Sequence, residues 1–290
     1  MLPVPSNPSQ KRILVLYFSQ TGTVKRGIET LLESVDAAGH SITYVPLEPS
    51  QPLPFPWGFF PFFGIFPETV LGPTMDILPP RLPLESKYDL IILGVPIWFL
   101  SPAQPIQSFL QSSEAVILNQ CPILPFISCR ELWVEGFKGL EEKMGTRHAP
   151  MLNPIVIKEP LSSWKSYLST PLFLITGHRI FTPDQRHEEQ MHSLRTIGIS
   201  LSHSLTESAL PLIPFPRIES QSKAFEAFGK ASFRLWAKWI RCFSPPKTLR
   251  RSFAICLFFL YLLAAIPLLK WWAWADRLLE SDLPLELQSP

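Results

Sequence analysis

The stretch LYFSQTGTVKRG, residues 16–27, combines side chains that suit the binding of a phosphate group. Hydroxyl groups surround Gly22, which permits a tight turn and a close approach to a ligand. A helix is expected to begin here, and the free N–H groups of its first turn, together with its dipole, favour an anion. We predict a phosphate-binding loop, while a polar turn with a serine or threonine cap is the alternative. The predicted binding residues are Ser19, Gln20, Thr21, Gly22, Thr23 and Val24.

Two common nucleotide-binding patterns are absent from this stretch. Gly22 and Gly27 have the interval of a GxxxxGK[ST] loop, but Ile28 stands where that loop has its lysine. The GxGxxG pattern of dinucleotide-binding folds is missing as well. The sequence therefore favours neither a nucleoside triphosphate nor a dinucleotide as the source of the phosphate.

Other residues with chemical potential give weaker signals. His187 and His192 are separated by five positions, whereas two zinc ligands on a helix need the i, i+4 spacing to share a face, so we expect no metal site. Cys129 has no histidine near it in the sequence, which favours a buried structural thiol over a nucleophile. These patterns identify no catalytic residue.

The elements that would position the phosphate loop alternate along the chain. Apolar, β-branched runs predict strands, and apolar residues at three- and four-residue steps predict helices between them. Strands are expected at 12–18, 41–47, 88–95, 121–128 and 153–159, and helices at 22–39, 102–113, 132–145 and 184–206. Residues 170–180, TPLFLITGHRI, are expected to be extended. Because parallel neighbours need crossover connections, this order predicts an α/β fold with a doubly wound, five-stranded parallel sheet.

The predicted domain, residues 12–207, is interrupted by an unusual insertion. Residues 50–84 are dense in proline and aromatic residues, carry little charge and show no regular periodicity. Such an insertion either packs on the domain, covers a ligand as a lid or contacts a membrane. Residues 1–11 are expected to be disordered, and residues 208–232 are expected to form a linker.

The C-terminal residues 233–290 differ in character from the domain. The segment 253–275 starts with 17 uncharged residues and is long enough to cross a hydrocarbon layer of about 30 Å. Basic residues are concentrated before it, which places the domain in the cytoplasm. Residues 232–243 alternate aromatic and basic side chains, as an interfacial helix does. We predict a cytoplasmic domain anchored to membrane lipid by residues 253–275, either as a transmembrane helix or within one leaflet; a buried helix of a soluble domain is the remaining alternative.

The composition bounds the class of partner. The formal net charge of +2 gives no reason to expect a nucleic acid. The chain is 46% hydrophobic and only 17% charged, with 32 prolines, so apolar irregular segments or membrane contact are expected besides a core. The 4 cysteines form no CxxC pair and are expected to be reduced.

The first loop resembles the phosphate loop of flavodoxins, [ST]-x-T-G-x-T, with Val24 in place of the final threonine. The resemblance implies a flavodoxin-like domain that binds FMN and holds its isoalloxazine ring between the loops after the third and fourth strands. Those loops are residues 94–102, GVPIWFLSP, and 128–133, SCRELW. Trp98 also fits a core position, and Arg130 a surface ion pair. The residues implied to contact the ring are Pro96, Ile97, Trp98, Phe99, Ser128, Cys129 and Arg130.

A narrower resemblance covers residues 12–200. The combination of VLYFSQTG, LGVPIWFLSP, SCRELW, FPETVL and TPLFLITG is similar to the family of dialkylresorcinol condensing enzymes. This resemblance implies a flavin protein of aryl-lipid biosynthesis that aromatises a cyclic intermediate made by a partner ketosynthase. Independently of that resemblance, the apolar insertion at residues 50–84 fits a hydrophobic substrate.

Three hypotheses for the function follow. The first is an FMN-dependent oxidoreductase that acts on a hydrophobic substrate at the membrane. The second is a flavodoxin-type electron carrier without substrate chemistry, against which the near-neutral charge and the apolar insertion count. The third is a membrane-tethered scaffold without flavin, for which Val24 is the best argument.

Overall fold

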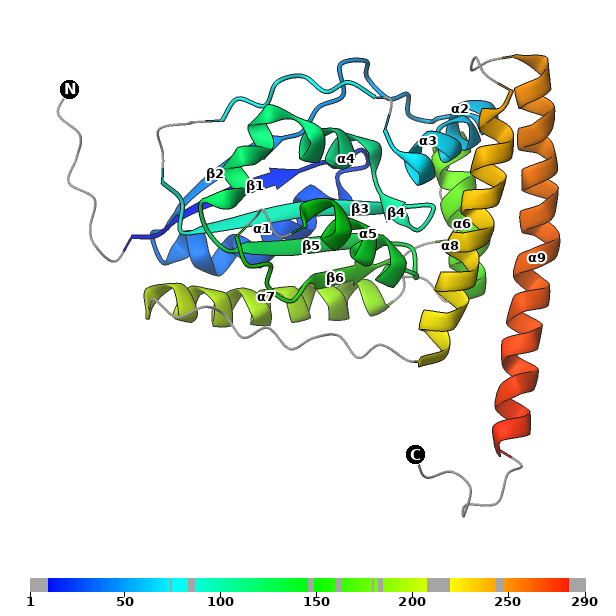
Figure 1. Cartoon of the computed structure of the whole chain (residues 1–290). Coiled ribbons are helices and arrows are strands. Elements are labelled where there is room, and N and C mark those ends of the chain that lie inside the picture. Colours follow the sequence, from blue (N-terminus) through cyan, green and yellow to red (C-terminus); the bar gives the residue numbers. More distant parts are fainter. Residues whose placement is uncertain are drawn as a thin grey trace.

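A computed structural model gives the fold of the chain (Figure 1). The structure describes residues 10–73, 75–82, 87–145, 149–159, 163–178, 180–181, 185–207, 220–243 and 248–281, without the side chains of 163–164, 166–168, 170, 220–224 and 266–281. Of the residues 1–11 that were predicted to be disordered, residues 1–9 lie outside the described residues, as does the first part of the predicted linker, residues 208–219.

The centre of the molecule is a parallel β-sheet. Its strands are β1 (Arg12–Tyr17), β2 (Ser41–Pro46), β3 (Leu90–Trp98), β5 (Ile123–Cys129) and β6 (Ile155–Lys158), in the order β2-β1-β3-β5-β6. All four pairings are parallel. A two-residue strand, β4 (Ser101–Pro102), returns antiparallel on the end of β3. The predicted doubly wound, five-stranded parallel sheet is confirmed.

Helices cover both faces of the sheet. One face packs against α1 (Thr23–Ala37) and α7 (Gln185–Thr206), and the other packs against α4 (Gln104–Gln111), the 3₁₀ helix η1 (Ser113–Asn119) and α5 (Val134–Met144). Successive strand residues contribute to opposite faces, as Leu14 and Val15 do. The central strands β1, β3 and β5 are buried on both sides, which explains why they read as continuous apolar runs.

A glycine allows α7 to lie against α1. A Cβ atom on Gly198 of α7 would meet the carbonyl oxygen of Leu31 at 2.1 Å and its carbonyl carbon at 3.1 Å. Both atoms belong to the backbone of α1, so neither can move aside without shifting a helix. Ser202 Oγ, one turn later, donates to the carbonyl oxygen of Ser34 at 3.2 Å.

Gly198→Ala is therefore expected to lower the free energy of unfolding by about 2–3 kcal/mol, because overpacking costs more than alanine gains in helix propensity. The matched control is Gly139→Ala in α5, where the nearest atom to an added Cβ is Pro102 Cδ at 3.8 Å. That change is expected to be neutral or stabilising by up to about 1 kcal/mol. Denaturant unfolding of the two variants measures both effects, and equal midpoints would contradict the close helix contact.

The insertion contains two helices, α2 (Phe59–Gly64) and α3 (Phe66–Leu71), where the sequence showed no regular periodicity. They pack against α8 (Ser220–Arg241) and α9 (Leu249–Ser281). Phe66 and Phe258 stack there with ring centroids 4.0 Å apart. We call the buried residues of this second core the aromatic cluster. They are Phe63, Phe66, Ala237, Ile240, Ala254, Ile255 and Phe258.

Two predicted boundaries were wrong. Residues 220–232, predicted as part of a linker, are helical because α8 begins at Ser220, and this helix packs against α3 and α5. Residues 170–176, predicted as extended, belong to α6 (Ser163–Thr176), which contains Pro171. In both cases tertiary packing outweighed the local signals of linker and strand. The final helix predicted at 184–206 is confirmed as α7.

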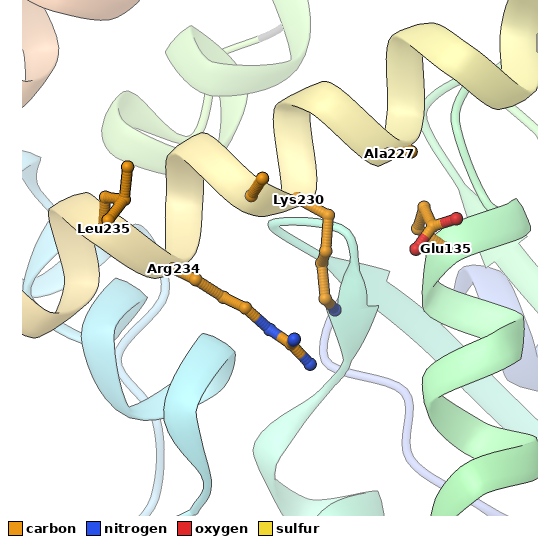
Figure 2. A pocket seen from close by; sticks show the side chains of 6 residues that line it. Glu135, Ala227, Lys230, Arg234 and Leu235 are labelled. Atoms are coloured by element: carbon orange, nitrogen blue, oxygen red, sulfur yellow. The ribbon is translucent and has the colours of Figure 1, made fainter.

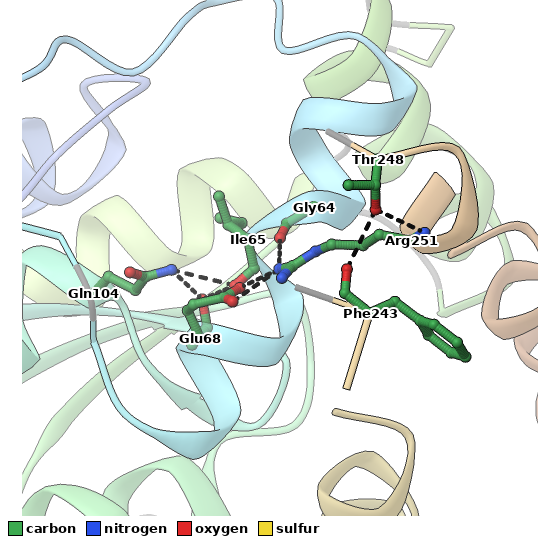
Figure 3. Close-up of polar contacts among 8 residues, drawn as sticks. Gly64, Ile65, Glu68, Gln104, Phe243, Thr248 and Arg251 are labelled. Carbon is green, nitrogen blue, oxygen red and sulfur yellow. Dashed lines mark hydrogen bonds and ion pairs between the residues drawn. The ribbon is translucent and has the colours of Figure 1, made fainter. Parts of the chain in front are cut away.

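A buried ion pair joins α9 to the insertion (Figure 3). Arg251 Nη2 lies 2.7 Å from Oε2 of Glu68, and the two side chains are 2% and 10% exposed. Arg251 also donates to the carbonyl oxygen of Gly64 at 3.1 Å. On the other side of α3, Gln104 of α4 donates to Ile65 O and to Thr69 Oγ1. The first turn of α9 is thus fixed to α3, and α3 is fixed to the parallel domain.

The C-terminal hydrophobic helix is α9. Over the residues that the structure describes, no helix has the length and apolar character that crossing a bilayer requires. The predicted anchor, residues 253–275, continues beyond Ala265 into side chains outside the described part of the chain. Within the described part, its first turns bury Ala254, Ile255 and Phe258 in the aromatic cluster.

Candidate functional site

The loop between β1 and α1 presents unused hydrogen-bond donors at the carboxyl edge of the sheet. Gly22 has φ 79° and occupies the N-cap position of α1 without a side-chain cap. Within the described residues, no oxygen accepts a hydrogen bond from the backbone N–H groups of Gln20, Thr21 or Gly22. Thr21 Oγ1 and Thr23 Oγ1 lie 3.1 Å apart. The loop therefore presents backbone and hydroxyl donors together, which is the arrangement that an anion needs.

An arginine that the sequence analysis missed lies beside this loop. A Cβ atom on Gly22 would be 3.4 Å from Nη1 and 3.7 Å from Cζ of Arg26. Arg26 begins the second turn of α1, and its backbone N–H donates to Gly22 O at 3.0 Å. The guanidinium thus adds a permanent positive charge to the donors of the loop.

Two of the predicted phosphate-binding residues have a structural role for their side chains. Val24, which replaces the final threonine of the flavodoxin pattern, is 2% exposed and belongs to the core under α1. Its Cγ1 lies 2.7 Å from the position of a Cβ on Gly94, so the side chain points away from the loop. Ser19 Oγ accepts a hydrogen bond from the backbone N–H of Lys25 at 3.3 Å. The side chain of Val24 is buried, so only its backbone N–H is left for the predicted contact with a phosphate.

The turn after β3 has an uncommon backbone. Phe99 and Leu100, between β3 and β4, have φ values of 49° and 57°. This is the geometry of a two-residue hairpin turn, which glycine and asparagine usually occupy, and it costs a bulky residue about 1–2 kcal/mol. The ring of Phe99 packs against Phe62, Phe63 and Phe66. Phe99 therefore contacts the insertion, although the sequence analysis placed it against a flavin ring.

Trp98 joins the first two loops. Its ring centroid lies 5.5 Å from that of Phe18, which follows β1, and 5.8 Å from that of Trp57 in the insertion. Both contacts are edge-to-face. The structure thus brings Trp98 to the phosphate loop, and it adds Trp57 to the site.

The insertion lies over two of the predicted binding loops. Gln20 Nε2 donates to the carbonyl oxygen of Pro54 at 3.0 Å. The backbone N–H of Trp57 donates to Leu174 O of α6 at 2.8 Å, and the Trp57 side chain is only 4% exposed. Residues 54–57 therefore pack on the domain beside the first two loops, which is one of the roles considered for the insertion.

The third loop follows β5. Ser128 is the register partner of Pro96, so the ends of β3 and β5 are neighbours, as the sequence predicts. Burial raises the pKa of the Cys129 thiol to about 12, and this thiol lies 3.8 Å from Ile157 O. The buried, protonated thiol agrees with a structural role. Arg130, partly buried, follows directly, and its carbonyl oxygen accepts from Glu159 N at 3.2 Å.

Ile97 and Pro96 complete the second loop. A Cβ on Gly136 of α5 would meet Ile97 Cδ1 and Cγ2 at 2.8 Å, so Ile97 packs directly on that helix. Pro96 O accepts from Ala103 N at 2.9 Å, which closes the hairpin. Both residues therefore shape the second loop. A metal site has no counterpart here: among the described residues, no group of three or more His, Cys, Asp or Glu side chains could hold a metal ion.

Helix α8 holds the second and third loops with two charged side chains one turn apart. The buried carboxylate of Glu226 accepts from the N–H groups of Trp133, at 3.3 Å, and Glu135, at 2.8 Å, at the start of α5. Lys230 Nζ donates to Leu100 O and to Ser101 Oγ at the hairpin turn. Figure 2 shows Lys230 reaching from α8 beside a depression of about 410 Å³. A segment predicted as a linker therefore positions both loops.

Burial lowers the pKa of Lys230 to about 8. Between this value and the ordinary lysine value of about 10.4, the unfolded chain binds more protons than the folded chain, so the free energy of unfolding rises with pH in that window. Between pH 7 and pH 10.5, the free energy of unfolding of the wild type should rise by about 2 kcal/mol relative to that of Lys230→Met. The full pKa difference would give a larger value, but Lys230 is only partly buried and water screens part of the effect.

Denaturant unfolding at a series of pH values measures this difference. Lys25→Met is the control, because Lys25 is exposed on α1 and pairs with Glu29 across one turn. The control should track the wild type at every pH. Parallel curves for the wild type and Lys230→Met would contradict the assigned environment of the amine.

Comparisons with known proteins address the fold. No family model matches the chain, and no curated protein matches it. The sheet, however, has the strand order 2-1-3-4-5 once the two-residue β4 is set aside, and α1 and α4 leave β1 and β3 toward opposite faces. The fold is flavodoxin-like. In such sheets ligands bind where the connections diverge, which here is between the ends of β1 and β3.

Solved structures similar to this flavodoxin-like chain include several flavoproteins. A flavoprotein in complex with FMN from Lactobacillus acidophilus shares 18% identity over 50% of this chain and 93% of its own, with a TM-score of 0.41. Oxidised flavodoxin 1 from Bacillus cereus shares 14% identity over 69% of this chain and 99% of its own, with a TM-score of 0.38. At these scores the assignment of the fold rests on the strand order.

Proposed function

We propose that this chain binds FMN and acts as a flavin-dependent oxidoreductase on a hydrophobic substrate. The observation that carries the proposal is the loop of residues 19–23, whose free N–H donors and hydroxyl groups lie at the carboxyl edge of the sheet beside Arg26. A monoester phosphate is a dianion at neutral pH, and such a set of donors with one guanidinium fits it.

The residues around the loop also fit the rest of FMN. Trp98 is the partly exposed aromatic side chain beside the phosphate loop that a flat ring could pack on, and the buried Phe18 and Trp57 support it edge-to-face. Because Trp57 already contacts Trp98, a flavin ring would share Trp98 with Trp57. Residues 54–57 would then form one wall of the ring site. When bound, FMN supplies a two-electron acceptor or donor, and the chain supplies orientation and exclusion of water.

A hydrophobic substrate is supported by the continuity of the aromatic side chains. Trp57 contacts Phe62, and Phe62 contacts Phe99, so aromatic rings run without a break from Trp98 to the aromatic cluster. A hydrophobic substrate that approaches along the insertion would reach the loops after β1 and β3 through apolar surroundings. Aromatisation of a cyclic ketone, with loss of two hydrogen atoms to the flavin, is the reaction that the resemblance to dialkylresorcinol condensing enzymes suggests, and a ketosynthase would then be the partner that makes the substrate.

The experiment is a visible spectrum of the full chain, purified in detergent, before and after addition of FMN. The full chain is required because removal of α9 would leave Glu68 buried without Arg251. A yellow protein that releases FMN on denaturation supports the proposal. A colourless protein that ignores added FMN would instead favour a scaffold without flavin.

A second measurement separates an enzyme from an electron carrier. A cyclic ketone with a lipid tail is added to the oxidised holoprotein under anaerobic conditions, and the flavin absorbance is followed. Bleaching supports substrate oxidation. A flavin that exchanges electrons with artificial carriers, but never with such ketones, would favour the carrier.

A further inference from the structure

Helix α8 carries an exposed apolar stripe opposite its buried face. Phe228, Leu235 and Trp239 are 56%, 70% and 41% exposed. Their spacing of seven and four residues places them on one side of the helix. Ala237 and Ile240, which belong to the aromatic cluster, lie on the opposite side and are fully buried. Within the part of the chain that the structure describes, no side chain covers this stripe.

Helix α9 repeats this arrangement. Leu249, Phe253 and Leu260 are 90%, 65% and 58% exposed, and their spacing of four and seven residues again defines one side. Leu263 extends the same stripe at 46% exposure. Figure 1 shows the α8–α9 pair standing beyond the carboxyl edge of the sheet, with α9 outermost.

The two stripes meet near the connection between the helices. Side chains from both helices line a shallow depression of about 370 Å³ there. Four of the five are large and apolar, and the fifth is a cation. The lining residues are Trp239, Phe243, Leu249, Arg250 and Phe253.

The charge around this surface has a single sign. Residues 227–275 contain no aspartate or glutamate. Lys238, Arg241 and Arg250 are exposed on the same turns as the apolar stripes. Glu226 of α8 is buried on the domain side, and Glu135 and Glu142 of α5 act on Lys230, two turns before Lys238. Apolar side chains between exposed cations, with no anion among them, match a layer of anionic headgroups over hydrocarbon.

We infer that this surface, formed by the outward sides of residues 228–243 and 249–263, binds the face of an anionic lipid bilayer. Trp239, Leu249 and Phe253 enter the headgroup layer, and the cations contact lipid phosphates. A second copy of the chain is a poorer occupant, because a symmetric contact would bring like charges together. The inference stands independently of FMN binding. It assigns the lipid contact to residues 228–263.

Flotation of the full chain with vesicles tests the inference. The vesicles contain phosphatidylcholine alone or with about 30% phosphatidylserine, at about 0.1 M and 0.5 M salt. The wild type is expected to float with the anionic vesicles, more strongly at low salt. Leu249→Ser/Phe253→Ser should reduce the bound fraction at least tenfold on these vesicles. Lys238→Glu/Arg241→Glu should reduce it similarly, and should leave any residual binding to neutral vesicles unchanged.

Val116→Ser is the matched control, because Val116 is an apolar side chain with 61% exposure on η1, a helix that packs on the sheet. It should float like the wild type. The inference is overturned if both double variants float as the wild type does, which would place the lipid contact beyond residue 265. It is also overturned if light scattering without vesicles shows a wild-type dimer that Leu249→Ser/Phe253→Ser converts to a monomer. Far-UV circular dichroism, expected to be unchanged, confirms that the exposed substitutions leave the fold intact.

Discussion

Arg26→Glu is expected to weaken the binding of FMN about a hundredfold. A charge-assisted hydrogen bond contributes about 1.5–3 kcal/mol, and the new carboxylate adds repulsion of the phosphate; a loss of about 3 kcal/mol corresponds to a hundredfold change in the dissociation constant. Arg26 is the side chain closest to Gly22 at the phosphate loop. Titration of the apoprotein with FMN, followed by quenching of flavin fluorescence, measures the effect.

Two controls make this result specific to the phosphate. Lys25→Glu reverses the adjacent charge, but Lys25 is exposed and pairs with Glu29, so a change of less than about threefold is expected. Riboflavin lacks the phosphate, so Arg26→Glu should leave riboflavin binding as it is in the wild type. Equal losses for FMN and riboflavin would mean that the substitution disturbs the ring site, and unchanged FMN binding would remove the phosphate from this loop.

Glu68→Ala is expected to destabilise the chain by about 3–5 kcal/mol, because it leaves the guanidinium of Arg251 buried without its carboxylate. A single guanidinium nitrogen, Nη2 of Arg251, lies 2.8 and 2.7 Å from the two carboxylate oxygens of Glu68. Denaturant unfolding of the full chain measures the loss. Because this pair fixes α9 to α3, limited proteolysis should also cut the C-terminal helix earlier in the variant.

The pair itself is not expected to stabilise the fold by that amount. A double replacement, Glu68→Leu with Arg251→Met, removes both charges and should lie within about 1–2 kcal/mol of the wild type. Glu33→Ala breaks the exposed pair with Arg195, in which both side chains are 55% exposed, and should cost less than about 1 kcal/mol. A Glu68→Ala variant as stable as Glu33→Ala would show that water reaches Arg251.

These two sites belong to different layers of the same molecule. The phosphate loop is built on the parallel sheet, whereas Glu68 and Arg251 hold the insertion and α9 together. Trp57 and Phe99 link the layers, because Trp57 of the insertion contacts Trp98 at the end of β3, and Phe99, directly after β3, contacts Phe62 of the insertion. A change in the aromatic cluster can therefore reach Trp98 through packed side chains alone.

The sequence by itself determined the parallel domain and the donor-rich loop after β1. Strands buried on both faces read as continuous apolar runs, and their alternation with amphipathic helices leaves few topologies, so the sheet could be predicted. The loop could be predicted because its donors are local: Gly22 and the residues around it need only the start of one helix. Arg26, one turn further, lay within the same local signal.

Tertiary structure alone decided the rest of the site. Glu226 and Lys230 lie far in sequence from the loops that they hold, in a segment whose composition suggested a linker. Val24 occupies the position of a threonine in the flavodoxin pattern, but its side chain is buried between α1 and the sheet. Phe99 turned toward the insertion because aromatic side chains about 35 residues earlier surround it there. Such contacts depend on which surfaces meet, and no local periodicity encodes that choice.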